Sequence, residues 1–383
     1  MDFKLTEEQQ MVKETIRKFV EKECTKERIR QLDEKDELPQ EIYRKIAELG
    51  VMGLTIPKEN GGAGRDILGA IIILEELAKR YQPIAWLYLM GAFYGGENLN
   101  HYGDERQKQI YLPRLAKGEI LFSYALTEPN AGSDLASIRT TAIEDGDNYI
   151  LNGTKTFISG ADYNNYLLTM ARTDKNVPPH KGLTMFIVDA KSEGISIKPM
   201  PKLGIKGISL CDIFFDNVIV HKKDILGGPS FVNKGWPQLL GALEVEHLEM
   251  GAVSIGLAQG AFEEAIKYAK ERKQFDQPIG KFQAIQHMLA EMATEISMGR
   301  IHLYYTAWLI EQHKTSSIES AMTKYYCAEV AKNVALNSMQ IMGGYGYTLE
   351  YDIQRYVRDA LIMPIGGGTS QIQKNMIAKL LGL

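Results

Sequence analysis

Apolar residues recur every three or four positions over the first part of the chain, which predicts amphipathic helices. The segment Thr6-Glu7-Glu8-Gln9 has the pattern of a capping box and begins the first helix. The apolar positions of this helix are Met11, Ile16, Phe19 and Val20. A second helix is predicted between Pro39 and Gly50, and a third over residues 66–80. We therefore expect residues 1–120 to form an N-terminal helical domain.

The pattern changes to short runs rich in β-branched and aromatic residues, separated by glycine-containing turns, which predicts strands. These runs cover residues 149–151, 166–170, 183–188, 195–197 and 213–215. After Trp236 the helical spacing returns. One stripe of a long helix is formed by Leu248, Ala252, Ile255, Ala258, Phe262 and Ile266. The sequence thus predicts a mostly helical α+β protein, with a central β domain over residues 121–230 and a C-terminal helical bundle over residues 231–383.

Composition narrows the possible partners of this chain. It has 383 residues, 24% of them charged, with a net charge of −4 and no basic block, so we do not expect it to bind nucleic acid. The apolar run at 70–74 is too short to span a bilayer, and the N-terminal residues resemble neither a secretory signal nor a transit segment. We expect a cytoplasmic enzyme without a membrane partner. Neither the three cysteines nor the seven histidines have metal-site spacing, so no metal is expected.

Two segments carry residues suited to a flat, polar ring system. Residues 124–134 begin extended and then turn at Pro129 into small residues whose backbone N–H groups can approach an anion or a ring. Phe157 and Ser159 are two positions apart, so in a regular strand they share one face, where they would stack on a ring and hydrogen-bond to its edge. Taken alone, each segment is more typical of an ordinary strand or turn than of a ligand site.

Taken together with three further segments, they resemble the acyl-CoA dehydrogenase family over the whole chain. The five segments are 126–134, 153–159, 271–275 with 278–283, 340–347, and 358–359 with 368–372. The resemblance implies a central β-barrel-like domain between an N-terminal helical domain and a C-terminal four-helix bundle. It also implies FAD as the cofactor, acyl-CoA as the substrate, electron-transfer flavoprotein as the electron partner, and a homotetramer built as a dimer of dimers.

The resemblance also implies site residues. Those expected around the flavin ring and its neighbouring turn are Tyr124, Leu126, Thr127, Gly132, Ser133, Phe157 and Ser159. Those expected to hold the dinucleotide of the neighbouring subunit are Arg272, Phe275, Gln283, Gln340, Gly343 and Gly344, with Thr369 and Gln371 near the adenosine half. Those expected to contact the substrate are Ser133, Glu244, His247 and Gly367.

The reaction of the family removes an α-proton beside a thioester carbonyl while the β-hydrogen leaves as hydride to flavin N5. Most members carry the basic carboxylate on the loop that here reads Ile365-Gly366-Gly367-Gly368-Thr369-Ser370-Gln371, so Gly367 cannot act as the base. Glu246 occupies the position that resembles the helix-borne base of isovaleryl-CoA dehydrogenase. Glu244 and Glu249 are the alternatives for this role.

Two departures from the family pattern affect substrate binding. His247 stands where Arg is usual; its side chain is shorter and titrates, so CoA binding is expected to differ. Gly366 replaces a bulky residue, and together with Gly95 and Gly96 it suggests a widened acyl pocket. The glycine triplet also resembles crotonobetainyl-CoA reductase and its relatives.

The leading hypothesis is an FAD-dependent acyl-CoA dehydrogenase that uses Glu246 as its base. The same catalyst could run as an enoyl-CoA reductase, because direction depends on the flavin potential and the electron partner. An oxidase that passes electrons to O₂ is a further alternative, although such relatives are usually much longer. A catalytically silent flavin- or CoA-binding protein is the alternative that the glycine loop raises.

Overall fold

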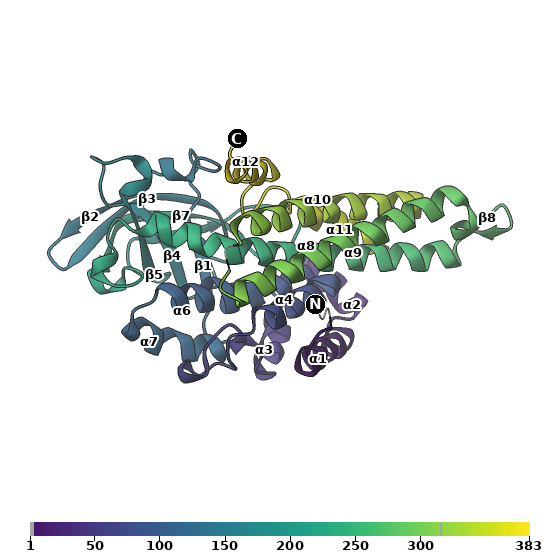
Figure 1. Cartoon of the computed structure of the whole chain (residues 1–383), viewed down its shortest axis with the longest axis horizontal. Helices are drawn as coiled ribbons and strands as arrows, with labels where there is room; N and C mark the ends of the chain where they lie inside the picture. Colours follow the sequence, from purple (N-terminus) through teal and green to yellow (C-terminus); the bar gives the residue numbers. More distant parts are fainter. Residues whose placement is uncertain (1–3, 315) are drawn as a thin grey trace.

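The computed structural model describes residues 4–314 and 316–383, and in them helices, a sheet and helices follow one another along the chain, as predicted (Figure 1). The helices before the sheet are α1 (Glu7–Glu23), α2 (Lys26–Lys35), α3 (Gln40–Glu48), α4 (Ile67–Arg80), α5 (Gln82–Leu89), α6 (Asn98–Tyr102) and α7 (Glu105–Ala116). A π-helical segment, Met90–Glu97, joins α5 to α6. The structure therefore confirms the mostly helical α+β class, while the domain limits at 120 and 230 stay a prediction.

Local sequence signals explain where the first helices begin and end. Thr6 Oγ1 accepts a hydrogen bond from Gln9 N at 3.1 Å, and Gln9 Oε1 accepts one from Thr6 N at 3.2 Å, which is the predicted capping box. Gly50 follows α3 with φ +74, a conformation that favours glycine. Met11 is exposed rather than part of the buried face of α1, because five positions place it roughly 140° around the helix from Ile16.

The central sheet has seven strands in the order β1-β4-β2-β3-β7-β6, with β5 paired to β4. The strands are β1 (Phe122–Ala125), β2 (Thr141–Asp145), β3 (Asn148–Ser159), β4 (Tyr166–Arg172), β5 (Leu183–Asp189), β6 (Ile195–Pro199) and β7 (Leu210–His221). The strand β2 was not among the predicted runs. Most of its residues are exposed, so it lacks the apolar alternation on which a sequence-based prediction depends.

Three long helices dominate the C-terminal part: α8 (Gly235–Glu271), α9 (Gln283–Glu311) and α10 (Ser317–Met342). A short hairpin of β8 (Lys273–Gln274) and β9 (Gln277–Pro278) joins α8 to α9. Two short helices, α11 (Ile353–Ala360) and α12 (Ser370–Leu380), pack against α10. The bundle therefore combines three long helices with two short ones. Within the described residues, no helix is both long and apolar enough to cross a bilayer.

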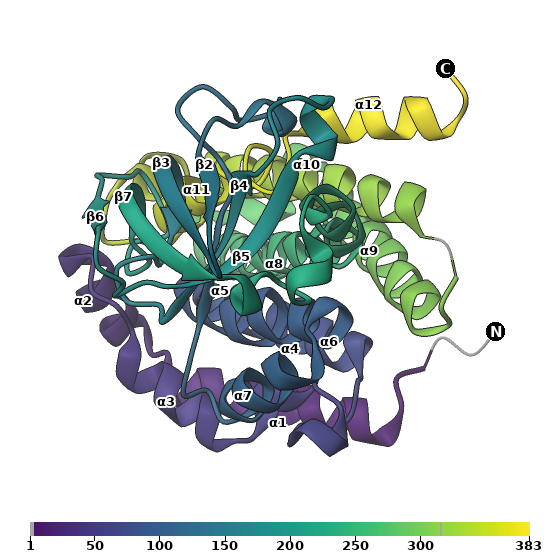
Figure 2. The ribbon, with the colours of Figure 1, turned by 90° about the vertical axis from the view of Figure 1, so that its left-hand side faces the viewer.

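Packing joins the two helical parts into one body. Helix α4 lies against α8, and apolar side chains from both ends of the chain share one core, while the sheet has a smaller core of its own. Figure 2 shows the sheet beside the ends of α8 and α10, with α4, α6 and α7 on the opposite side of α8 from α12. Helix α8 thus contacts both α10 and strand β5 of the sheet.

Candidate functional site

Glu246 is a buried carboxyl on α8 without a hydrogen-bond partner. The residue is 8% exposed, and its Oε2 has no partner among the described residues. Burial raises the pKa of Glu246 to about 7, against the opposing effect of the Lys324 ammonium. A carboxyl with a pKa near neutrality can both take up and release a proton at physiological pH, which is the property a general base needs.

The glycine loop lies directly against this carboxyl. A Cβ atom added to Gly367 would stand 3.7 Å from Glu246 Oε1 and 3.1 Å from Met250 Cγ. Gly367 and Gly368 have φ values of +63 and +82, which side-chain-bearing residues rarely adopt. The loop thus approaches α8 with its bare backbone, and the Glu246 carboxyl lies next to the space that a loop side chain would enter.

Lys324 of α10 holds the loop in this position. Its Nζ donates to Met363 O at 2.9 Å and to Gly368 O at 2.6 Å. Burial lowers the pKa of Lys324 to about 8, while the Glu246 carboxyl acts in the opposite direction. Lys324 was not among the predicted site residues. The signal that could have identified it is a lysine within a helical stripe of small buried residues that includes Ala321 and Ala328.

His247 points away from solvent toward Gln373. The His247 and Gln373 Nε2 atoms are 3.0 Å apart, and Gln373 Nε2 also donates to Gly367 O at 3.4 Å. Burial, aided by Lys324, lowers the pKa of His247 to about 3. The imidazole therefore stays neutral at physiological pH, in contrast to the expectation that it titrates there. Its contact with substrate stays a prediction.

Of the two rival carboxyls, Glu244 turns to a different partner and Glu249 shares the buried face of α8. Glu244 accepts a hydrogen bond from Ser316 Oγ at 3.0 Å and another from the Ser317 hydroxyl, so it links α8 to the start of α10. Its predicted contact with substrate is not tested by this geometry. Glu249 is buried, and burial raises its pKa well above the usual value.

The segment after β1 is fixed by a buried ion pair. Lys155 Nζ donates to Leu126 O at 2.9 Å and to the Glu128 carboxylate at 2.8 Å. Thr156 N donates to Thr127 O at 2.9 Å. Tyr124, Leu126 and Thr127 are half-buried, so part of each side chain faces outward from this fixed backbone.

Phe157 lies at an irregularity in β3. The register with β7 shifts between Lys155 and Ile158, and Phe157 has φ +59. The prediction that Phe157 and Ser159 share a face assumed a regular strand, which β3 is not at this point. The bulge leaves the Phe157 ring 61% exposed and Ser159 half-buried. An exposed aromatic ring at a bulge suits stacking on a flat ligand.

Gly132 and Ser133 lie in an exposed turn beyond this segment. A Cβ atom on Gly132 would meet nothing within 4 Å. A ligand could therefore approach this backbone closely.

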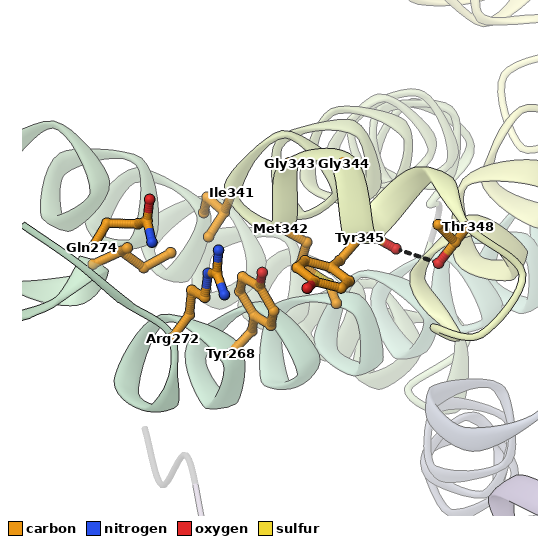
Figure 3. A pocket seen from close by; sticks show the side chains of 10 residues that line it. Tyr268, Arg272, Gln274, Ile341, Met342, Gly343, Gly344, Tyr345 and Thr348 are labelled. Atoms are coloured by element: carbon orange, nitrogen blue, oxygen red, sulfur yellow. Dashed lines mark hydrogen bonds between the residues drawn. The ribbon is translucent and has the colours of Figure 1, made fainter.

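A second group of predicted residues lines a groove of about 480 Å³ at the far end of α8 (Figure 3). The groove includes Arg272, whose guanidinium stands 5.3 Å from the centre of the Tyr345 ring. Its rim includes Gly343 and Gly344, where an added Cβ would meet nothing within 4 Å. A fork of donors beside open backbone is a fitting site for a pyrophosphate.

The other predicted dinucleotide residues lie outside this groove lining. Phe275 is 87% exposed at the turn of the β8–β9 hairpin. Gln283 at the start of α9 and Gln340 near the end of α10 are also exposed. Thr369 caps α12 by accepting from Ile372 N at 3.2 Å, and Gln371 is exposed on the same helix. Their roles stay predictions.

The prediction of a widened acyl pocket is partly wrong. A Cβ on Gly95 would stand 2.6 Å from Leu115 Cδ2, and one on Gly96 would stand 2.9 Å from Thr55 Oγ1. The volume beside these two glycines is therefore filled by neighbouring side chains, which pack closely against the π-helical segment. At Gly366 an added Cβ would meet only Ile362, at 3.7 Å, so space remains on that side of the loop.

The chain is similar to known proteins over its whole length. The chain matches the acyl-CoA dehydrogenase N-terminal domain over residues 6–119, the middle domain over residues 123–218 and the C-terminal domain over residues 233–382. It is 42% identical to a 3-(aryl)acrylate reductase of Clostridium sporogenes, over 97% of this chain and 98% of that protein. It is 41% identical to the caffeyl-CoA reductase–Etf complex subunit CarC of Acetobacterium woodii, over 98% of each.

A solved structure of butyryl-CoA dehydrogenase from Megasphaera elsdenii is also similar, with a TM-score of 0.96 and 31% identity over 100% of both chains. The finer resemblances to isovaleryl-CoA dehydrogenase and crotonobetainyl-CoA reductase stay predictions. The chain belongs to the acyl-CoA dehydrogenase family and is an oxidoreductase that acts on acyl-CoA with FAD as its cofactor.

Proposed function

We propose that Glu246 is the base that takes the α-proton of the acyl-CoA thioester. The observation that carries this proposal is a buried carboxyl with an unpartnered oxygen and a raised pKa, beside a loop that offers no side chain of its own. Lys324 stands close enough to influence the charge of Glu246 but donates its hydrogen bonds to the loop instead. The carboxylate therefore stays free to bind the proton.

The backbone of Gly367 is suited to hold the thioester carbonyl. Within the described chain its N–H donates to no other group, whereas Gly366 N donates to Ile362 O at 2.9 Å. A free N–H beside the base could polarise the carbonyl and acidify the α-proton. Bound FAD supplies the acceptor of the β-hydride.

We propose further that the dinucleotide is shared between two copies of the chain. The sheet with Phe157 and the hairpin beside Arg272 lie at opposite ends of the long axis in Figure 1. One cofactor cannot reach both ends of the same chain, so the Arg272 groove would serve the neighbouring subunit. This supports the dimer within the homotetramer that we propose. A mass measurement of the holoprotein in solution, together with FAD loss in Arg272→Ala, tests it.

Electron-transfer flavoprotein is the proposed electron partner, because a relative that matches 98% of the chain is named as a subunit of a complex with Etf. The names of two relatives favour a second direction, enoyl-CoA reduction, on the same site. In that direction Glu246 would return a proton to the α-carbon. The oxidase alternative is distinguished by reoxidation of the reduced flavin with and without O₂.

The decisive experiment is anaerobic mixing of the yellow holoprotein with a panel of CoA thioesters. We expect Glu246→Gln to bind FAD normally and to slow flavin bleaching by at least about a thousandfold, because an amide cannot accept the proton. Glu263→Gln, an exposed change on the same helix, is the matched control and should bleach at the wild-type rate. Full activity of Glu246→Gln would refute the assignment. A wild type that no CoA thioester bleaches would favour the silent protein.

A further inference from the structure

Among the described residues, two buried carboxyls differ from the other buried carboxyls in that they accept no hydrogen bond. Each remaining buried acidic side chain in the described chain accepts a hydrogen bond from a cation, a hydroxyl or a backbone N–H. These satisfied residues are Glu23, Glu75, Glu76, Glu97, Glu128, Asp352 and Asp359. Within the same described residues, Glu246 and Glu249 make no hydrogen bond or ion pair. Proteins rarely bury a carboxyl without a partner unless a ligand completes its environment.

The proposed role as base explains why Glu246 is buried without a hydrogen-bond partner, but it does not explain why Glu249 is. Glu249 is 3% exposed, and its Oε2 is buried without a partner. Three positions separate it from Glu246, so the two side chains are neighbours on one face of α8, with Cβ atoms about 5–6 Å apart. A substrate whose α-carbon lies beside Glu246 would therefore bring Glu249 near the acyl carbons a few bonds further on. CoA itself is too large and too charged for this buried side of the helix.

Among the described residues, the groups that influence Glu249 are polar but include no cation. Tyr94 and Tyr124 have ring centres 4.4 Å apart. Burial, and then the charges of Glu246 and Glu249, raise the pKa of both hydroxyls well above the usual value. Asn98 Nδ2 donates to Tyr124 Oη at 2.5 Å, whereas the Tyr94 hydroxyl makes no hydrogen bond within the described residues. Glu97, which also influences Glu249, is already paired with Arg65.

The protonation of Glu249 restricts the ligand further. Burial, with help from Glu246 and Glu97, raises the pKa of Glu249 well above its usual value, which favours the neutral carboxylic acid over the carboxylate. A neutral carboxylic acid donates one hydrogen bond and accepts others. A carboxylate on the substrate would find Glu246 and no free cation here. A purely apolar chain would leave the acid unsatisfied, which weakens binding.

We propose that Glu249, with the Tyr94 hydroxyl, recognises a neutral hydroxyl group on the acyl part of the substrate, a few bonds from the reacting carbons. This inference rests on the proposed function, since it takes Glu246 to fix the α-carbon. It makes Glu249 a specificity residue that contacts substrate, distinct from the base. The preferred substrates are hydroxyl-bearing acyl- or enoyl-CoA thioesters rather than apolar or anionic ones.

The test compares matched thioesters on the holoenzyme by anaerobic flavin bleaching. The pairs are para-hydroxyphenylpropanoyl-CoA with phenylpropanoyl-CoA, and terminally hydroxylated pentanoyl-CoA with hexanoyl-CoA; glutaryl-CoA is the anionic probe. In the wild type we expect kcat/KM to favour the hydroxylated member of at least one pair by roughly 10- to 100-fold. Glu249→Leu should abolish or invert that preference, because it should lower kcat/KM for the hydroxylated member much more than for the apolar member.

A second measurement separates recognition from damage to the fold. Removal of an unpaired buried carboxyl should raise Tm, so Glu249→Leu is expected to be more stable than the wild type and to keep its FAD. Glu249→Gln should keep much of the preference, because an amide also donates and accepts. Equal rates for both members of both pairs in the wild type, or a preference that Glu249→Leu leaves unchanged, would overturn the inference. Bleaching by the apolar member in such a case would still support the proposed function, so the two failures are distinguishable.

Discussion

The carboxyl of Glu246 and the α-carbon of Gly367 lie side by side, such that a Cβ atom at Gly367 would stand 3.7 Å from Glu246 Oε1. That distance is ordinary van der Waals contact, so a longer loop side chain would compete with the Glu246 carboxyl for one volume. The helix and the loop come from segments about 120 residues apart in sequence and meet only because α8 and α10 pack together. The lack of a side chain at Gly367 therefore leaves this volume to the carboxyl of Glu246.

Gly367→Ala should lower stability and activity together. An alanine at φ +63 costs about 1–2 kcal/mol, and its methyl group would press on Met250 at 3.1 Å. Gly146→Ala is a matched control, because Gly146 has φ +55 but an added Cβ there would meet nothing within 4 Å. Urea unfolding should show a larger loss for Gly367→Ala, and only that variant should slow flavin bleaching. Equal losses and full activity would contradict a tight contact at Glu246.

The pKa of Glu246 predicts opposite pH profiles for the two reaction directions. Proton abstraction needs the carboxylate, so the rate of flavin reduction by acyl-CoA should fall about tenfold per pH unit below a pKa of about 7. Proton delivery needs the carboxylic acid, so the reoxidation of reduced enzyme by enoyl-CoA should fall as pH rises above that value. Single-turnover absorbance in both directions checks this. Rates that do not change across this range in either direction would show that Glu246 does not transfer the proton.

Much of the fold was predictable because its signals are local. The capping box at Thr6, the glycine after α3 and the apolar stripe of α8 depend on residues close in sequence. The strand β2 and the exposed position of Met11 were missed, since pattern alone does not say which face a neighbour covers.

The site was less predictable, because its decisive contacts are long-range. Lys324 bonds to Met363 O and Gly368 O across about 40 residues of sequence, so only the packing of α10 beside residues 363–368 identifies it as a partner of the loop. The neutrality of His247 follows from burial against Gln373, which spacing in sequence does not encode. The glycines at 95 and 96 suggested empty space by their size. The side chains of Leu115 and Phe122 fill the space beside Gly95, and those of Thr55 and Ile56 fill the space beside Gly96.

The Lys155–Glu128 ion pair should be a strong determinant of stability. Lys155 is fully buried, and Glu128 also accepts from Arg139 N at 2.6 Å and from Thr140 N at 2.9 Å. Removal of one partner of a buried pair costs about 3–5 kcal/mol, because the other charge is left unpaired. We therefore expect Lys155→Met to lower the urea midpoint strongly and to weaken FAD binding, since Lys155 also positions Leu126.

Two further variants test the Lys155 prediction. Lys155→Met combined with Glu128→Leu should recover part of the lost stability, since no unpaired charge remains. Lys222→Met, which breaks the exposed pair with Glu144, should change the midpoint little. A small effect of Lys155→Met would show that the buried pair does not hold this segment.

Lys324→Met should move the pH profile of catalysis as well as loosen the loop. The Lys324 ammonium lowers the pKa of Glu246, so its removal should shift the acid limb of flavin reduction upward from about pH 7. The carbonyls of Met363 and Gly368 would lose their donor, which predicts a modest loss of stability.

A purely structural role for Lys324 would lower the rate without an upward shift of the profile. Lys324→Arg should restore the position of the acid limb even if it does not restore the full rate. Lys332→Met, which removes the half-buried ion pair with Glu329 on the same helix, should leave both unchanged. If the acid limb of Lys324→Met coincides with that of the wild type, Lys324 does not set the basicity of Glu246.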